Sequence, residues 1–198
     1  TNDTGRGIPS HFWALDSKHL LYIQDQNGDE NWHLYSVDLS SGRTIDLSPY
    51  KGVQAQMLAQ SESAPGIIVV GMNDRDPKWH DVYQVDLATG KRTLLSENNG
   101  FSSVLVDNAL QVRLATKTTK SGGQQVLRKD HDKWNLMMEI PFEDVQTTSI
   151  LGFDQSNQGI YMLDSRNRNT SALVHLDIAD KSITTIASSE HVDISNVL

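Results

Sequence analysis

A hairpin sequence that recurs along the chain constrains the fold more than any single residue. The segment 34–42, LYSVDLSSG, returns as VYQVDLATG at 82–90. Two fainter copies follow, and the equivalent aspartates Asp38, Asp86, Asp130 and Asp177 are 48, 44 and 47 residues apart. A period in this range, built from short strands, is typical of β-propeller blades. We therefore predict an all-β chain composed of propeller blades.

The repeat divides the chain into four four-stranded antiparallel meanders. Each copy holds four short runs of strand-forming residues separated by polar turns. The expected blades span approximately 11–48, 52–96, 100–141 and 148–187. The segment 191–198 lies where earlier copies have their first strand, and we predict that it begins a further blade. Closed propellers have about four to eight blades. We therefore expect a partial β-propeller domain over 1–198; four blades that close on themselves are the alternative.

Local patterns set further expectations within the copies. Polar residues predict a loop at 73–78 in the second copy, and the third copy is expected to have a strand at 110–115. The segment 54–60 is expected to be a strand rather than a helix because of its place in the repeat. The recurring aspartates can accept hydrogen bonds from turn amides about two residues on, so turn chemistry explains their recurrence.

The charge of the chain limits the partners that it can have. There are 25 acidic and 17 basic residues, and the formal net charge is −8. This balance argues against nucleic acid and against an anionic membrane surface as partners. No run approaches the roughly 18 apolar residues of a membrane-spanning helix, and we expect a soluble chain. The absence of cysteine excludes disulfides, thiolate catalysis and cysteine-ligated metal sites.

No motif for a complete catalytic, cofactor or metal site is found in the sequence. No serine has the two flanking glycines of a Gly-x-Ser-x-Gly nucleophile elbow. The seven histidines show no metal-ligand spacing, and no glycine-rich phosphate loop is present. The loop 25–31, DQNGDEN, alternates oxygen ligands as calcium requires, but its glycine falls at the fourth position rather than the sixth. We interpret it as a solvated hairpin loop.

Two sets of side chains remain as candidates for recognition. Arg75, Arg166 and Arg168 fall in expected loops that would gather on one face of a propeller, where recognition usually occurs. Solvated surface arginines are the alternative interpretation. Tryptophans can stack on sugars or peptides, but packing within or between blades is the role expected here; the four are Trp13, Trp32, Trp79 and Trp134.

The order of short phrases resembles one family of serine peptidases. The phrases are LLYIQD at 20–25, NGDENWHLYSVDL at 27–39 and DLSPY at 46–50. Further along are MNDRDP at 72–77 followed by DVY, and DSR at 164–166 followed by NT. They resemble the propeller of the prolyl oligopeptidase family, with the closest likeness to its bacterial acylaminoacyl-peptidase and dipeptidyl-aminopeptidase branches. The resemblance covers nearly the whole chain.

The resemblance implies a non-catalytic role. In that family a propeller of seven or eight blades caps an α/β-hydrolase domain that carries the catalytic Ser, Asp and His. No residue of this chain matches that triad. The implied role is to gate the access of short peptides to an active site carried by the α/β-hydrolase domain of the same parent chain. The parent is then a serine-type peptidase, and this chain alone is expected to be inactive and to need no cofactor.

Two other functions stay open at this point. One is a protein-binding propeller scaffold without enzymatic activity, like that of TolB; the other is a calcium-dependent or lectin-like propeller. An open array of blades exposes strand edges at its two ends, which makes a homo-oligomer formed through those edges a further expectation. Both the bacterial periplasm and the cytoplasm are compatible with the sequence.

Overall fold

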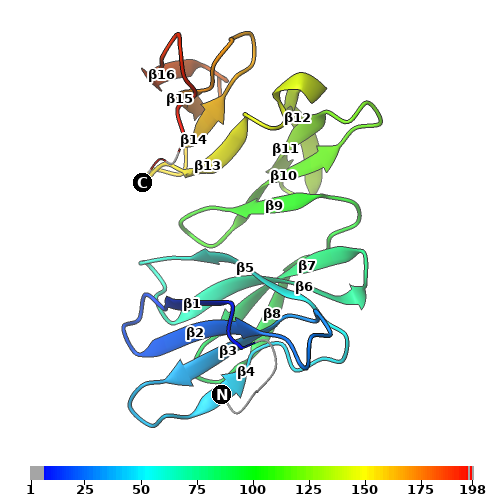
Figure 1. Ribbon diagram of the computed structural model, residues 1–198, viewed down its shortest axis with the longest axis vertical. Helices are drawn as coiled ribbons and strands as arrows, with labels where there is room; N and C mark the ends of the chain where they lie inside the picture. The colour runs from blue at the N-terminus through cyan, green and yellow to red at the C-terminus, as the bar shows by residue number, and fades with distance from the viewer. Residues whose placement is uncertain (1–6, 196, 198) are drawn as a thin grey trace. The chain divides into compact units, whose positions relative to one another are not determined.

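The computed structural model describes residues 7–195 and residue 197. Among these residues it is all-β, with sixteen strands in four sheets, one short 3-10 helix and no α-helix (Figure 1). No helix in these ranges has the length and hydropathy needed to cross a membrane. The predicted four antiparallel four-stranded meanders of a β-propeller are confirmed.

Each of the four sheets is made of four strands that are consecutive in the chain. In the first two sheets the strands are β1 (Ser10–Trp13), β2 (His19–Gln24), β3 (His33–Asp38), β4 (Thr44–Asp46), β5 (Ala55–Gln60), β6 (Ile67–Asp76), β7 (Trp79–Asp86) and β8 (Arg92–Ser96). In the last two they are β9 (Ser103–Val106), β10 (Val112–Thr118), β11 (Gln124–Asp130), β12 (Lys133–Ile140), β13 (Ser149–Phe153), β14 (Gly159–Asp164), β15 (Ala172–Asp177) and β16 (Ile183–Ala187). The 3-10 helix η1 (Phe142–Asp144) connects the third sheet to the fourth.

The chain forms two compact units. The first holds the residues up to Gly100 together with Asn108–Val112, and the second holds Phe101–Asp107 and the residues from Arg113 onward. Each unit therefore contains two of the four sheets and is described by itself.

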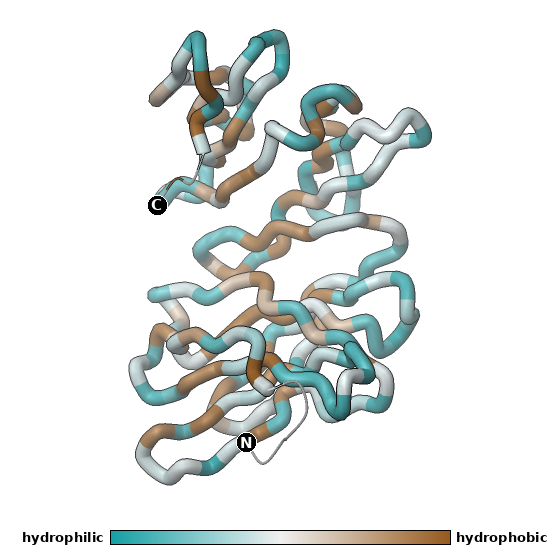
Figure 2. The backbone as a smooth tube through the Cα atoms, in the orientation of Figure 1, coloured by the Kyte–Doolittle hydropathy of each residue, from teal (hydrophilic) through white to brown (hydrophobic). Residues whose placement is uncertain are grey.

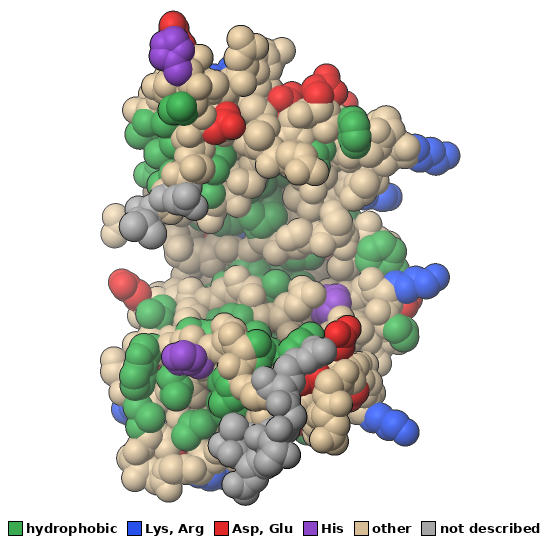
Figure 3. Space-filling model, in the orientation of Figure 1, with side chains coloured by type: hydrophobic (Ala, Val, Ile, Leu, Met, Phe, Trp, Pro, Cys, Tyr) green, Lys and Arg blue, Asp and Glu red, His purple; other side chains and the backbone are tan. Residues whose placement is uncertain are grey.

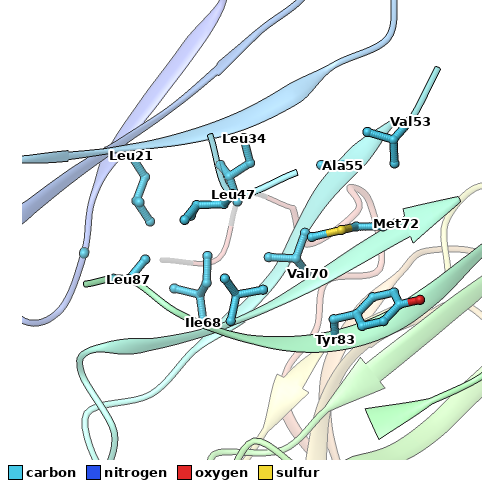
Figure 4. Close-up of a cluster of buried hydrophobic side chains, with 12 residues drawn as sticks. Leu21, Leu34, Leu47, Val53, Ala55, Ile68, Val70, Met72, Tyr83 and Leu87 are labelled. Atoms are coloured by element: carbon cyan, nitrogen blue, oxygen red, sulfur yellow. The ribbon is translucent and has the colours of Figure 1, made fainter. Parts of the chain in front are cut away.

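The core of the first unit lies between its two sheets. Leu21 and Leu34 of the first sheet point toward Ile68 and Val70 of the second (Figure 4). All four side chains are fully buried. Successive residues of a strand point to opposite faces, so Leu21 in β2 and the pair Ile68 and Val70 in β6 each lie on the face that enters this core. Hydrophobic residues appear brown along the backbone in Figure 2. Burial of apolar surface between successive sheets thus holds the first unit together.

Hydrogen bonds fasten the same two sheets at their inner strands. The side-chain amide of Gln60 accepts from the Leu15 amide at 3.1 Å and donates to the Trp13 carbonyl at 3.3 Å. The Ala55 amide donates to the carbonyl of Trp32 at 2.7 Å. The side chain of Gln60 in β5 therefore bonds one backbone N–H and one backbone carbonyl at the C-terminal end of β1.

The second unit repeats this construction principle with different residues. Its core joins side chains of the third and fourth sheets, among them Val126, Ile160, Met162 and Val174. Phe153 and Val145 pack against this cluster from its margin. Each unit therefore has a core of its own, as expected of stacked repeats.

The recurring aspartates act as predicted in three of the four hairpins. Asp38 accepts from the Ser40 and Ser41 amides at 2.8 and 3.0 Å, and Asp86 accepts from the Thr89 amide at 2.8 Å. Asp177 accepts from the amides of Ala179 and Asp180. The expectation is wrong for Asp130, whose carboxylate lies 3.2 Å from the His131 ring instead. That hairpin turns within two residues, because Asp130 already pairs with Lys133.

Two expected segment boundaries are corrected by the structure. The polar residues 73–78 do not form a loop: β6 runs on to Asp76, which pairs with Trp79 across the two-residue turn at Pro77. The register shifts between Met72 and Asp76, so β6 accommodates its extra residues as a bulge. In the third sheet the strand expected at 110–115 begins only at Val112, because Leu110 has a φ of +58° and belongs to the turn. The strand predicted at 54–60 is present as β5.

The C-terminal segment follows the fourth sheet as β5 follows the first. The Ile194 amide donates to the Ser171 carbonyl at 3.0 Å, just as the Ala55 amide donates to Trp32, and both pairs are 23 residues apart. No strand is assigned at 191–195 or at 197, and residues 196 and 198 lie outside the described residues. A further blade beginning at 191–198 therefore stays a proposal.

The inter-sheet core of the first unit gives a stability prediction. Leu34→Ala removes a fully buried side chain and leaves a cavity, which costs about 2–5 kcal/mol. Leu39→Ala is the matched control, because Leu39 lies five residues on and is largely exposed; its expected effect is within about 0.5 kcal/mol. Urea unfolding followed by circular dichroism measures both, and equal losses in the two variants would contradict this account of the core.

Candidate functional site

Arg75 was expected in a loop, but it belongs to strand β6 and is bound to a buried carboxylate. Its Nε and Nη2 donate to the two oxygens of Asp81 at 2.6 and 2.8 Å, and Nη2 also donates to the Asn98 carbonyl at 2.9 Å. Burial opposes the ionisation of Asp81, but the hydrogen bonds from Arg75 and from the Asn98 amide outweigh it and lower its pKa. The bidentate geometry is that of a strong ion pair, and it orders the end of the β6–β7 hairpin.

Arg166 is held by a carboxylate of the same connection. It lies just after β14, and its Nε and Nη2 both donate at 2.8 Å to the oxygens of Asp164. Its side chain is 16% exposed and that of Asp164 is 7% exposed. Burial raises the pKa of Asp164, but the hydrogen bonds from Arg166 outweigh burial and the net shift is downward. The main interaction of Arg166 is therefore internal to its loop.

Arg168 is the exposed arginine of this group. Its backbone amide donates to the Ser165 carbonyl at 3.0 Å, which fixes the turn, while the residue itself is exposed. Of the three arginines selected from the sequence, two thus form bidentate ion pairs and one is exposed. Arg75 lies in the first unit, and Arg166 and Arg168 lie in the second.

An arginine that sequence reasoning missed has the most elaborate surroundings. The guanidinium carbon of Arg92 lies 4.0 Å from the ring centre of Tyr50 and 4.4 Å from that of Tyr83. Its Nη1 donates to Asp74 at 2.7 Å, and the Tyr83 hydroxyl donates to the other oxygen of Asp74 at 3.1 Å. Burial and the charge of Asp74 raise the pKa of Tyr83 to about 12. No sequence pattern marks this group, because its members come from β6, β7, β8 and an inter-sheet connection.

Several histidines form pairs with aspartates. His19 lies 2.6 Å from Asp16, and His33 lies 2.9 Å from Asp46. His175 lies 2.9 Å from Asp154, whose other carboxylate oxygen accepts from the Ser156 hydroxyl. These pairs join neighbouring turns and strands. His80 differs: its buried Nε2 has no hydrogen-bond partner among the described residues, and burial lowers its pKa.

The calcium-like loop at 25–31 is ordered by its own hydrogen bonds. Asp29 accepts from the Gln26 and Asn31 amides, and the Asn31 side chain donates to it at 3.0 Å. Its carboxylate therefore serves as an acceptor for the loop backbone. In the described part of the chain, no group of three or more His, Cys, Asp or Glu side chains is placed to hold a metal ion.

An apolar groove of about 650 Å³ lies at the inner strands of the first unit. Its lining includes the large apolar side chains of Phe12, Ile23, Trp32 and Met57. Trp32, just before β3, and Trp79, the first residue of β7, are half-buried, in line with a packing role. The ring centres of Trp134 and Phe101 are 4.7 Å apart. Trp13 does not follow the packing expectation. It is 62% exposed, because its side of β1 has no sheet against it within the first unit.

The described residues thus offer ion pairs, ordered turns and an apolar groove. These features are suited to binding a ligand or to selecting molecules by their size and shape. In the described ranges the rings of His19, His33, His131 and His175 lie against aspartates, and no hydrogen bond joins a histidine ring to a serine hydroxyl.

Comparison with known sequences identifies peptidases as relatives. No protein-family model matches the chain. It is 42% identical over 200 residues to dipeptidyl aminopeptidase BIII from Pseudoxanthomonas mexicana, an alignment that covers 100% of this chain and 29% of the relative. It is 26% identical over 215 residues to dipeptidyl peptidase family member 6 from Caenorhabditis elegans, with the same coverage. The chain therefore spans less than a third of the length of these relatives.

Comparison with solved structures supports the propeller fold. TolB from Acinetobacter baumannii matches 92% of this chain and 44% of its own, with a TM-score of 0.58 and 14% identity. A structure from a study of two prolyl endopeptidases matches 92% of this chain and 29% of its own, with a TM-score of 0.56 and 11% identity. At such low identity these likenesses concern the fold.

The two arginines of the β14–β15 connection give a paired prediction. Arg166→Leu leaves the buried carboxylate of Asp164 without its bidentate donor, and we expect a loss of about 1–3 kcal/mol in the free energy of unfolding. Arg168→Leu, two residues away and exposed, is expected to change it by less than about 0.5 kcal/mol. Thermal and urea unfolding measure both variants. A loss at Arg168 as large as that at Arg166 would contradict the assigned roles.

The Asp154–His175 pair gives a pH prediction. Burial by itself raises the pKa of Asp154. Hydrogen bonds from His175 and Ser156 outweigh the effect of burial, and the pKa falls from 3.8 to about 2. The folded state therefore binds the proton less readily than the unfolded state, so the stabilisation is present above about pH 4 and is lost as the pH falls toward about 2. Asp154→Asn should unfold at a lower urea concentration than the parent at pH 6, and this difference should shrink steadily from about pH 5 to pH 3. Asp132→Asn, in an exposed turn, serves as the control; a difference for Asp154→Asn that does not vary with pH would refute the prediction.

Proposed function

We propose that this chain gates the access of short peptides to a serine-peptidase active site. It fits an N-terminal propeller part of a prolyl oligopeptidase family peptidase. In this proposal the nucleophile, the base and the oxyanion donors are carried by an α/β-hydrolase domain of the same parent chain. The propeller would be part of a ring of seven or eight blades. The chain by itself would be a non-catalytic fragment.

The observation that carries the proposal is the 42% identity to a dipeptidyl aminopeptidase over the whole chain. It is supported by four sheets whose topology is that of propeller blades. A rigid array of blades presents its connections as a rim, and substrates too large to pass the rim are excluded without any specific contact. Short peptides are therefore the substrate class that the architecture favours.

The arginines have different parts in this proposal. Arg75 and Arg166 would hold the hairpin and the connection that form the rim, since each is bound to a carboxylate through two hydrogen bonds. Arg168 would be the rim residue that meets the peptide, because its side chain is exposed. An exposed arginine can pair with a peptide carboxylate without breaking a structural ion pair.

A protein-binding scaffold without enzymatic activity is the second candidate. The observation in its favour is the fold likeness to TolB, which covers 92% of this chain. That likeness comes with 14% identity, whereas the peptidase relative is 42% identical. The peptidase assignment is therefore the better supported of the two. A homo-oligomer formed through exposed strand edges of the blade array is compatible with either candidate function.

A chimera tests the gating proposal directly. This chain would replace the 200 aligned residues of dipeptidyl aminopeptidase BIII, and the chimera would be assayed on dipeptidyl p-nitroanilides and on casein. We expect dipeptide release at a rate within about tenfold of the parent enzyme, since the chemistry lies in the retained part, and no cleavage of casein. The isolated 198-residue chain should hydrolyse neither substrate above the buffer background.

Two controls make the outcome interpretable. Size-exclusion chromatography and thermal unfolding show whether the chimera folds, and a version with Arg168→Ala tests the rim residue. A folded chimera that cleaves casein would refute steric gating by this chain. Turnover by the isolated chain that resists a serine-directed inhibitor would refute the non-catalytic assignment.

A further inference from the structure

The sequence contains two Asn-Gly pairs, and the structure gives them different surroundings. Asn27–Gly28 lies between β2 and β3, and Asn99–Gly100 lies between β8 and β9. Both asparagines are exposed. Exposure therefore does not distinguish the two pairs, and the difference between them lies in their hydrogen bonds.

An asparagine that precedes a glycine can lose its side-chain amide without an enzyme. After a solvent base removes the proton of the glycine N–H, the nitrogen attacks Cγ of the asparagine; an N–Cγ bond forms, the Cγ–Nδ2 bond breaks, and Nδ2 takes a proton from water and leaves as ammonia. Water then opens the cyclic imide to aspartate or isoaspartate. Glycine permits the ring closure because it has no Cβ to restrict the backbone. The glycine N–H must therefore be free to ionise, and the asparagine amide must be free to turn toward it.

The Asn27–Gly28 pair meets both conditions. It occupies the centre of a turn that the Asp29 amide closes on the Gln26 carbonyl at 3.2 Å. The φ angle is +56° at Asn27 and +80° at Gly28, positive at both central positions as in a type I′ turn. Among the described residues, no hydrogen bond engages the Asn27 side chain or the Gly28 N–H. Both reacting groups are therefore available.

The Asn99–Gly100 pair is held at both reacting groups. The Gly100 N–H donates to Oδ1 of Asn98 at 3.0 Å. Oδ1 of Asn99 accepts from Nη2 of Arg75 at 3.2 Å. The same Nη2 also donates to Asp81 and to the Asn98 carbonyl, so this donor is fixed in place. The glycine nitrogen and the asparagine amide can react only after both hydrogen bonds have broken.

We propose that Asn27 is a site of spontaneous deamidation in the folded chain and that hydrogen bonds protect Asn99 from the same reaction. Water is the only co-reactant, and ammonia is the leaving group. Arg75 then has a second role besides its ion pair with Asp81, because it holds the amide of Asn99.

The reaction changes the loop 25–31 in charge and in length. Deamidation adds a carboxylate to a segment that already has three acidic residues, in a unit whose surface carries acidic side chains, drawn red in Figure 3. Isoaspartate also inserts a methylene into the main chain, which is incompatible with the turn closed between Gln26 and Asp29. Because the Glu30 carbonyl accepts from Nε2 of Gln54 at 3.0 Å, the change reaches the connection that leads into β5.

This reaction does not depend on the proposed peptidase role. It rests on hydrogen bonds within the first unit, which contains both Asn-Gly pairs and their partners, and it is measured without any peptide substrate. A negative result would leave the chimera experiment unaffected, and a failed chimera would leave the deamidation result unaffected.

Peptide mapping by mass spectrometry tests the proposal. The unmodified chain is incubated at mildly alkaline pH and digested, and the conversion of Asn27 and of Asn99 is followed over time. We expect Asn27 to convert at least about tenfold faster than Asn99, because two hydrogen bonds must break before Asn99 can react. Asn27→Gln is the control for the assignment, since its longer side chain closes a less favourable ring, and it should remove the acidic species seen on ion-exchange chromatography.

Two further measurements separate the effect of structure from that of sequence. In the urea-unfolded chain the two pairs should convert at rates within about twofold of each other, because the protecting hydrogen bonds are absent there. Asn98→Ala removes the side-chain acceptor of the Gly100 N–H and keeps the backbone groups that bind Arg75 and Asp81. It should accelerate conversion at Asn99 by at least about threefold, and near-ultraviolet circular dichroism verifies that the variant is folded.

Three outcomes would overturn the proposal. The first is conversion of Asn27 at a rate equal to or below that of Asn99 in the folded chain. The second is a rate difference that persists unchanged in urea, since the flanking sequence would then be its cause. The third is a folded Asn98→Ala variant in which Asn99 converts no faster than in the unmodified chain.

Discussion

Burial of apolar side chains between successive four-stranded sheets is the interaction on which the rest of the structure depends. A single meander of four short strands has two faces and cannot bury either of them alone. In the first unit, Leu21 and Leu34 are removed from water only because Ile68 and Val70 of the next sheet cover them. The ion pairs and ordered turns lie at the ends and margins of these sheets, so they depend on a scaffold that the inter-sheet cores create.

Much of the fold was predictable because it follows from a repeated local pattern. The four antiparallel meanders and the strand expected at 54–60 are present, and three of the four recurring aspartates bind turn amides as expected. The error at 73–78 has a physical cause: polar composition indicates exposure, and a two-residue hairpin with a bulge is as exposed as a loop. The length of β6 is set there by the pairing of Asp76 with Trp79, and the composition of the segment does not reveal this pairing.

The candidate site was less predictable than the fold. Sequence reasoning selected Arg75 and Arg166 for their expected loops, yet both form bidentate ion pairs with nearby aspartates. It overlooked Arg92, whose partners Tyr50, Asp74 and Tyr83 are distributed over 34 positions of the chain. A side chain's partner depends on the register of strands, and register is a tertiary property. Residue type alone therefore cannot separate a structural arginine from one that meets a ligand.

The 48-residue spacing between Asp38 and Asp86 has a consequence for how such a chain can change in evolution. Each repeat brings both the surface that covers its predecessor and the surface that its successor covers. Duplication or loss of a whole repeat therefore leaves every remaining junction chemically compatible, whereas a shift of one residue within a strand exchanges its buried and exposed sides. Strand register within a repeat is therefore more tightly constrained than the number of repeats.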